Sequence, residues 1–244
     1  MFARVERFPG PDMSTSQDQA KLRAAKAGVE FVHDGMILGL GSGSTSELFV
    51  RELGERLRHE KMTIRAVATS DRTAQIASTY GIHLIDPESV GHLDLALDGA
   101  DEVDPEFRMI KGRGGALLRE KIVASAANQR IIMVDRSKLV DRLGSRHELP
   151  VEVSNFGHRW TSARMAPFAT DVHVRLDRHG MPYRTDGGNL ILDVRTGPID
   201  NPQTLESQLL AIPGVYETGL FIGLCDILIV AEADDLEIRR KADG

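Results

Sequence analysis

The segment most informative about the fold is Met36-Ile-Leu-Gly-Leu-Gly-Ser-Gly-Ser-Thr45. Its first part, residues 36–40, is a short apolar run typical of a buried strand, and it ends in a loop of glycines and serines. After the loop, four apolar residues recur at helical spacing and predict a helix: Leu48, Phe49, Leu53 and Leu57. A strand that passes through a glycine-rich turn into a helix is typical of an α/β unit.

Strands and helices alternate on both sides of this unit. Before it, a capping box at Ser16 and Gln19 and a glycine at Gly35 predict a helix with both of its ends marked. After it, the apolar patterns predict strands at 63–68, 82–85, 93–97, 107–110 and 131–134, and helices at 71–80 and 116–128. This alternation predicts an α/β fold with a doubly wound, mostly parallel, Rossmann-like sheet.

The pattern changes after about residue 144. Strands are expected at 149–153, 171–176, 189–194 and 215–221, with helices at 157–165 and 202–211. This β-α-β-β-α-β order is that of the ferredoxin-like motif, and a last strand at 226–231 is expected to return to the first sheet. We therefore predict an N-terminal arm (1–15), a Rossmann-like catalytic domain (16–144 plus 222–244) and an inserted ferredoxin-like α+β module (145–221) that can supply a dimer interface.

Composition narrows the class of protein. The chain has 244 residues, 41% of them hydrophobic and 27% charged, as in globular domains. Its net charge of −6 argues against a general nucleic-acid binder. We also find no apolar stretch long enough to span a membrane, no secretory signal at the start, one cysteine (Cys225) and no zinc-binding spacing among the histidines. We expect a cytoplasmic protein with no metal and with neither nucleic-acid nor membrane partners.

Three segments can carry chemistry, and the first is the loop Gly39–Thr45. Its glycines allow close approach to a ligand, and the hydroxyls of Ser42, Ser44 and Thr45 add donors to the N-terminus of the following helix. This combination suits a phosphate. The spacing matches neither the Walker A motif nor the dinucleotide fingerprint, so no nucleotide cofactor is expected. The alternative is a plain tight turn.

The second segment is Leu97-Asp-Gly-Ala-Asp-Glu-Val-Asp104. It follows a predicted strand, and the carboxyl ends of strands are where open α/β sheets bind ligands. Asp98 and Asp101 can face one cleft, where neighbouring carboxylates raise one another's proton affinity. An acidic solvated turn and a Mg²⁺ site are the alternatives.

The third segment is Lys111-Gly-Arg-Gly-Gly-Ala-Leu-Leu-Arg-Glu-Lys121. Lys111 can neutralise charge that develops on a substrate oxygen, and Glu120 can act as a general base. Because Arg119 and Lys121 flank Glu120, a solvated charged helix face is the alternative.

Together, in order and rough spacing, these three segments resemble the type A ribose-5-phosphate isomerases. Leu149-Pro-Val-Glu-Val153 and Ala211-Ile-Pro-Gly-Val215 extend the resemblance, which runs from about residue 17 to 229. It implies interconversion of D-ribose 5-phosphate and D-ribulose 5-phosphate through an enediolate, in the non-oxidative pentose phosphate pathway. It also implies that no cofactor is needed and that the partner is a small-molecule sugar phosphate. The resemblance further implies a homodimer.

The resemblance also implies residue roles. Glu120 aligns with the proton acceptor, Asp98 and Asp101 with carboxylates that contact the sugar, and Lys111 with the lysine that stabilises the enediolate. Further positions align with substrate-binding residues: Lys21, Ser42, Gly43, Ser44, Thr45, Gly99, Ala100, Gly112, Arg113, Gly114 and Lys138. Arg113 stands where many relatives have glycine and adds charge to the cleft mouth, and Leu118 stands where many have threonine.

Two other functions fit parts of the pattern. One is a non-catalytic sugar-phosphate sensor, although the 13 residues before Ser14 leave no room for the helix-turn-helix that such sensors usually carry. The other is a Mg²⁺-dependent phosphotransferase that uses Asp98, Asp101 and Asp104.

Overall fold

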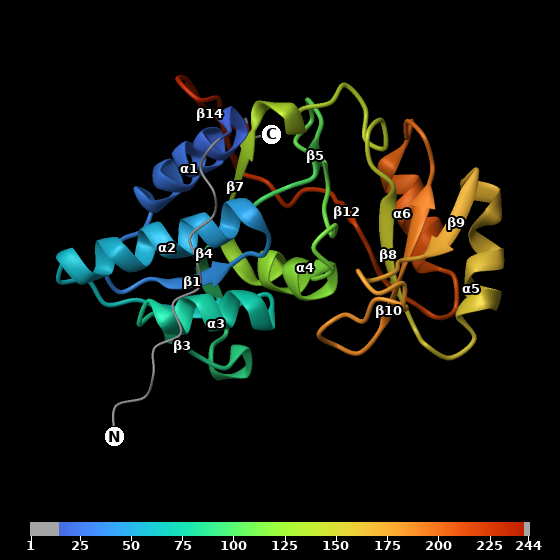
Figure 1. Cartoon of the computed structure of the whole chain (residues 1–244), viewed down its shortest axis with the longest axis horizontal. Helices are drawn as coiled ribbons and strands as arrows, with labels where there is room; N and C mark the ends of the chain where they lie inside the picture. Colours follow the sequence, from blue (N-terminus) through green and yellow to red (C-terminus); the bar gives the residue numbers. More distant parts are fainter. Residues whose placement is uncertain (1–14, 242–244) are drawn as a thin grey trace. The chain divides into compact units, whose positions relative to one another are not determined.

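The structure is a computed structural model that describes residues 15–241 (Figure 1). Its described residues form two compact units. Unit 1 contains residues 15–99, 126–136 and 227–240, and unit 2 contains residues 100–125, 137–226 and 241. Residues 1–14 of the predicted N-terminal arm lie outside the described residues.

The division into units differs from the predicted domain boundaries. Residues 100–125, which the sequence placed with the first domain, belong to unit 2. The reason is strand pairing: β5 (Glu102–Val103) and β6 (Met109–Ile110) form a three-stranded antiparallel sheet with β12 (Leu220–Phe221). The pairing of β6 with β12 joins segments far apart in the sequence, and local patterns do not reveal it.

Unit 1 is built on a seven-stranded sheet in the order β14-β13-β7-β4-β1-β2-β3. The strands are β1 (Ile37–Leu40), β2 (Arg65–Ala68), β3 (His83–Leu84), β4 (Leu93–Asp98), β7 (Ala127–Asp135), β13 (Ile227–Ala231) and β14 (Leu236–Arg240). All neighbours run parallel except β14, which is antiparallel to β13. Without β14, the order is that of the doubly wound dinucleotide fold, with its switch point between β1 and β4. The predicted fold class and the return of β13 to this sheet are confirmed.

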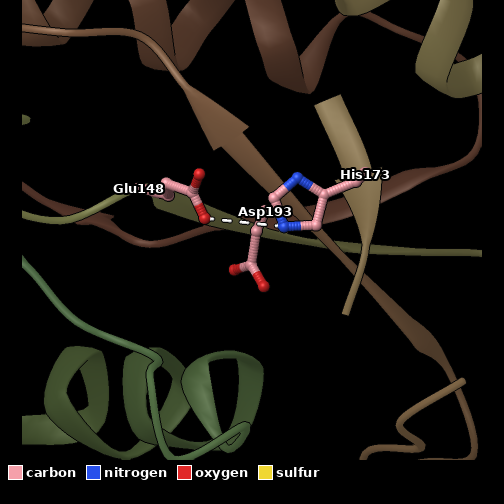
Figure 2. Close-up of side chains that lie close together, drawn as sticks. All are labelled: Glu148, His173 and Asp193. Carbon is pink, nitrogen blue, oxygen red and sulfur yellow. Dashed lines mark ion pairs between the residues drawn. The ribbon is translucent and has the colours of Figure 1, made fainter. Parts of the chain in front are cut away.

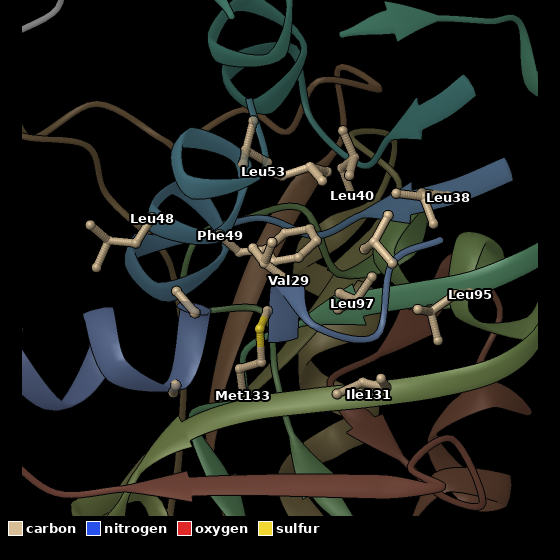
Figure 3. Close-up of a cluster of buried hydrophobic side chains, with 14 of the residues drawn as sticks. Val29, Leu38, Leu40, Leu48, Phe49, Leu53, Leu95, Leu97, Ile131 and Met133 are labelled. Atoms are coloured by element: carbon tan, nitrogen blue, oxygen red, sulfur yellow. The ribbon is translucent and has the colours of Figure 1, made fainter. Parts of the chain in front are cut away.

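Three helices of unit 1 are α1 (Ser16–Val29), α2 (Ser44–His59) and α3 (Asp71–Thr79), and a 3-10 turn spans Pro87–Ser89. Helix α1 packs on α2 and contacts β7 and β13. It begins one residue away from the predicted cap, because Thr15 rather than Ser16 accepts a hydrogen bond from the Asp18 amide. The core forms where α1 and α2 meet the sheet, and Figure 3 shows Phe49 of α2 amid side chains of the strands.

Unit 2 contains a four-stranded antiparallel sheet in the order β11-β8-β10-β9. Its elements follow the chain as β8 (Leu149–Val153), α5 (His158–Met165), β9 (Asp171–Val174), β10 (Leu190–Arg195), α6 (Pro202–Leu210) and β11 (Val215–Thr218), with a 3-10 turn at Ala166–Phe168. This is the split-βαβ arrangement of the ferredoxin-like motif, as the sequence predicted. A second core lies within this unit.

Of the element boundaries that differ from the prediction, two have a cause in long-range strand pairing. The strand expected at 215–221 is two strands in different sheets, because Gly219 lies between the backbones of Pro150 and Lys111 and bonds to both. Helix α4 (Leu117–Ala126) ends two residues early, because Ala127 already pairs with Leu93 of β4. In both places, pairing with a distant segment overrides the local pattern.

Within residues 15–241, no helix combines the length and apolar character that crossing a membrane requires.

Candidate active site

The first candidate segment lies at the switch point of the unit 1 sheet. The Gly41 amide donates to the Leu97 carbonyl over 2.9 Å, which brings the loop after β1 to the end of β4. A Cβ atom on Gly41 would lie 2.1 Å from the carboxylate carbon of Asp98, so only glycine fits there. Gly43, the N-cap of α2, has a φ of 95°, which glycine adopts without strain. These two glycines therefore shape the loop.

The carboxylate of Asp98 holds this loop in place. Its Oδ1 accepts hydrogen bonds from the Ser42 amide (3.1 Å), the Ser46 hydroxyl (2.9 Å) and the Gly99 amide (2.7 Å). Asp98 is 8% exposed. The structure thus brings Asp98 into contact with the loop, and Ser46, which no signal in the sequence marks, joins the contact.

The hydroxyl of Ser42 is directed into the protein. It donates to the Ser70 hydroxyl over 2.7 Å and lies 2.7 Å from the Thr69 hydroxyl. Ser70 caps α3, and Thr73 of that helix in turn donates to the Gly41 carbonyl over 3.0 Å. Ser42 therefore braces the loop through hydroxyl contacts within the protein.

Ser44 and Thr45 form the first turn of α2. Because the N-cap is Gly43, no side chain caps this end of the helix. The first-turn amides and the helix dipole therefore favour an oxyanion at this point. Lys21, in α1 of the same unit, lies 3.6 Å from Asp18 in an ion pair.

In unit 2 the structure brings Lys111 and Glu120 together. Lys111 follows β6, and Glu120 lies in the first turn of α4. The Lys111 Nζ is 3.4 Å from the Glu120 Oε2, and both side chains are 4% exposed. The Lys111 ammonium also lies 5.4 Å from the centre of the Phe221 ring. A buried ammonium–carboxylate pair is therefore the central feature of this segment.

The turn between these two residues depends on glycine. Gly112 and Gly115 have φ values of 104° and 84°. A Cβ atom on Gly112 would lie 2.9 Å from the Cβ of Leu117, within the closely packed start of α4. The glycine-rich turn thus lets the chain reverse between Lys111 and the helix that carries Glu120.

The flanking cations point elsewhere. Arg119 pairs with Asp186 at 3.4 Å, and Lys121 pairs with Glu206 at 2.9 Å and Glu217 at 2.7 Å. Glu120 alone of the three charged residues is buried. Its burial rules out the alternative that Glu120 is part of a solvated charged face.

A second group in unit 2 gathers around Asp101. Its Oδ2 accepts a hydrogen bond from the Arg113 amide over 3.0 Å. Burial lowers the pKa of His147 below its ordinary value, and the positive charges of Arg113 and Lys138 lower it further, against the opposing charges of Asp101 and Glu102. His147 was not a sequence-based candidate, because an isolated histidine carries no motif.

Glu102 positions His147. Its fully buried carboxylate accepts the amides of Gly144 (2.6 Å), Arg146 (2.7 Å) and His147 (2.7 Å). Glu102 belongs to the acidic segment 97–104, but no motif there indicates a role for it. Its position directly after Asp101 was the available signal.

The predicted site residues are thus divided between the units. Unit 1 holds Lys21, Ser42, Gly43, Ser44, Thr45, Asp98 and Gly99. Unit 2 holds Ala100, Asp101, Lys111, Gly112, Arg113, Gly114, Glu120 and Lys138. The segment 98–101 is the part of the chain that runs from the first group of residues to the second.

The proposed magnesium ligands do not fit a metal site. Asp104 is neutralised by Arg108, whose Nε lies 2.6 Å from its Oδ2, and its Oδ1 accepts two backbone amides. One carboxylate oxygen of Asp98 already accepts three hydrogen bonds. A hard cation needs oxygens that are not committed in this way.

Among residues 15–241, one other cluster has the composition of a metal site: Glu148, His173 and Asp193, whose ligand atoms lie within 4.8 Å of one another. Figure 2 shows the Glu148 carboxylate facing the His173 ring, 3.6 Å away. However, Arg195 donates twice to Glu148, and Arg175 pairs with Asp193. A cation would have to displace two guanidinium groups, so the cluster is better described as part of an ion-pair network.

Comparison with known proteins gives a consistent result. A family model described as "Ribose 5-phosphate isomerase A (phosphoriboisomerase A)" matches residues 65–235. Ribose-5-phosphate isomerase A of Thermomicrobium roseum is 47% identical over 92% of this chain and 95% of its own length. The corresponding protein of Chloroflexus aurantiacus is 46% identical over 92% and 94%.

Solved structures agree. Ribose 5-phosphate isomerase A of Methanocaldococcus jannaschii superimposes with a TM-score of 0.88 at 39% identity, over 93% of this chain and all of that one. A D-ribose-5-phosphate isomerase in complex with phospho-erythronic acid gives 0.89 at 36% identity over the same shares.

The contact between Gly41 and Asp98 predicts the effect of Gly41→Ala. The new methyl group must displace the Asp98 carboxylate, so we expect the free energy of unfolding to fall by about 1–3 kcal/mol in urea denaturation. Gly91→Ala is the matched control, because its Cβ meets no atom within 4 Å and its stability should stay within about 0.5 kcal/mol of the parent. Equal stability of the two variants would contradict this account of the loop.

The charges around His147 predict a pH effect. Arg113→Gln removes a positive charge that disfavours the imidazolium, so the pKa of His147 should rise, while burial continues to lower it. Since the folded state favours the neutral ring, protonation should cost stability as the pH falls below about 6.5. NMR titration of the ring measures the pKa. Arg142→Gln, which changes an arginine paired with Asp200, should leave it unchanged.

Proposed function

The chain belongs to the ribose-5-phosphate isomerase A family, and we propose that it interconverts D-ribose 5-phosphate and D-ribulose 5-phosphate. The observation that carries this proposal is the buried pair of Lys111 and Glu120, an ammonium and a carboxylate 3.4 Å apart. We propose that the reaction runs in the cytoplasm, as a step of the non-oxidative pentose phosphate pathway.

Glu120 acts as the base in the proposed mechanism. Aldose–ketose isomerisation removes a proton from the carbon next to a carbonyl and returns it to the neighbouring carbon. One carboxylate can serve both carbons, taking the proton from C2 and delivering it to C1. The fixed position of Glu120 in the first turn of α4, hydrogen-bonded through its amide to the Ala116 carbonyl, supports this role.

Lys111 stabilises the intermediate. Removal of the C2 proton leaves an enediolate, whose oxygen carries the negative charge. An ammonium group close to that oxygen lowers the barrier, and more so where water is excluded. The 4% exposure of Lys111 and its position beside the Phe221 ring support this assignment.

The remaining residues bind the substrate. We propose that Asp98 and Asp101 contact the sugar and assist ring opening and oxygen protonation. The uncapped first turn of α2, with Gly43, Ser44 and Thr45, suits the phosphate, and Lys21 and Lys138 add positive charge. The backbone of Ser42, Gly99, Ala100 and Gly112 to Gly114 completes the set. Binding energy from the phosphate positions C1 and C2 at the base.

A non-catalytic sugar-phosphate sensor is less well supported. A buried ion pair carries a desolvation cost that a binding module has no reason to retain, whereas proton transfer needs both groups.

We also propose a homodimer. Large apolar side chains are exposed on the ferredoxin-like module of unit 2, among them Phe156 at 85% and Trp160 at 74%. Exposed aromatic residues that gather on one module are typical of protein interfaces. A second copy of the chain is the partner that the family resemblance implies.

The mechanism predicts the effect of Glu120→Gln. The amide cannot accept the proton, so kcat for ribose 5-phosphate should fall by about 10²–10⁴-fold. A metal-free assay of ribose 5-phosphate conversion measures this. Glu55→Gln, on the exposed face of α2, should keep the parent kcat. Near-parent turnover in Glu120→Gln would remove Glu120 from the role of base.

The proposed dimer predicts a change in mass. Light scattering after size exclusion should give twice the mass of one chain. Phe156→Glu combined with Trp160→Glu should shift it toward one chain, because burying two carboxylates at an apolar interface is costly. Ile238→Glu, on the edge strand of unit 1, is the control and should not change the mass. A parent chain that elutes as a monomer would refute the dimer.

A further inference from the structure

Unit 2 contains a cavity of about 490 Å³ that none of the proposed catalytic side chains lines. This volume is within the range of small-molecule sites. Four arginines, one histidine and two carboxylates line it: Arg113, Arg146, His147, Glu148, Arg175, Asp193 and Arg195. Among the lining residues, cations thus outnumber anions.

Both carboxylates of the cavity are already neutralised. Arg175 pairs with Asp193 through two nitrogens, with its Nε 2.9 Å from the Oδ2. Arg195 donates to one oxygen of Glu148 from two nitrogens, at 2.9 and 2.7 Å. Figure 2 shows the two carboxylates beside the His173 ring. These pairs account for two arginines and both acids.

Arg113 and Arg146 remain as the surplus charge. Over the part of the chain that the structure describes, neither guanidinium lies within 4.0 Å of a carboxylate oxygen. Arg146 donates to the Ser137 carbonyl, a neutral partner. Because the pKa of His147 is lowered, its ring is neutral near pH 7 and leaves the surplus at two positive charges.

The wall of the cavity is held in place. Glu102 accepts the amides of both Arg146 and His147. Arg175 donates to the carbonyls of Gly112 and Arg113, at 2.8 and 3.0 Å, and so fixes the turn that carries Arg113. These bonds fix the backbone from which Arg113 and Arg146 project, so that part of the site loses little conformational freedom when a ligand arrives.

We propose that this cavity binds a small phosphate-bearing anion with two or more negative charges, held by the guanidinium groups of Arg113 and Arg146. The planar fork of a guanidinium matches two phosphate oxygens, and two such forks match the charge of a phosphate monoester or a diphosphate. The cavity adjoins Asp101, because the Arg113 amide donates to that carboxylate. Of the proposed substrate-binding residues, only Arg113 lines it.

Calorimetric titration with inorganic pyrophosphate tests the proposal, with no substrate present and with the full chain. We expect saturable binding to the parent protein and a dissociation constant about tenfold higher or more in Arg146→Gln. Arg146→Lys keeps the positive charge but lacks the two-pronged guanidinium group. Its dissociation constant should lie between those of the parent and of Arg146→Gln. Arg142→Gln is the matched control, because Arg142 is exposed, pairs with Asp200 and does not line the cavity.

Two results would overturn the proposal. One is the absence of saturable pyrophosphate binding to the parent. The other is an equal dissociation constant in the parent, Arg146→Gln and Arg142→Gln, which would place the anion elsewhere, such as at the first turn of α2. Arg146→Gln keeps the backbone bond to Glu102, and Arg146→Lys provides a second measurement if Arg146→Gln does not fold. The readout requires no turnover, so it is independent of the proposed isomerase activity.

Discussion

The close approach of Gly41 to Asp98 is the constraint on which the candidate site of unit 1 depends. Strands β1 and β4 are neighbours whose connections leave in opposite directions, so a space opens at their carboxyl ends. One carboxylate oxygen of Asp98 accepts two amides and a hydroxyl at this point. Any side chain at Gly41 would displace that carboxylate. The shape of the loop and the uncapped start of α2 follow from this contact.

A different constraint organises unit 2. Lys111 and Glu120 are both buried, and each compensates the charge of the other. Removal of either partner would leave a buried charge uncompensated, which typically costs about 3–5 kcal/mol. The glycine turn between them keeps the two groups at a fixed separation, as a proton transfer with charge stabilisation requires. A pair that is costly to bury for stability alone is consistent with a catalytic use.

A second buried glutamate of this unit, Glu102, has a structural role. Glu102 makes no ion pair with a side chain in the residues described, and its three hydrogen bonds come from backbone amides. It fixes the loop 144–147 to the strand that follows Asp101. Two residues that line the cavity, Arg146 and His147, are therefore tied through their amides to the residue directly after Asp101.

Local sequence determined which elements form, because apolar periodicity and glycine positions act over a few residues. The doubly wound sheet, the ferredoxin-like module and the glycine turns were predictable on that basis. Tertiary structure alone decided the partners of the polar groups: the hydroxyl of Ser42 turns toward Ser70, and Glu102 captures an amide 42 residues further along the chain. It also decided that Glu120 is buried while Arg119 and Lys121 reach distant carboxylates. Such contacts join residues far apart in the chain, and their energies depend on burial, which a one-dimensional pattern of residue types does not specify.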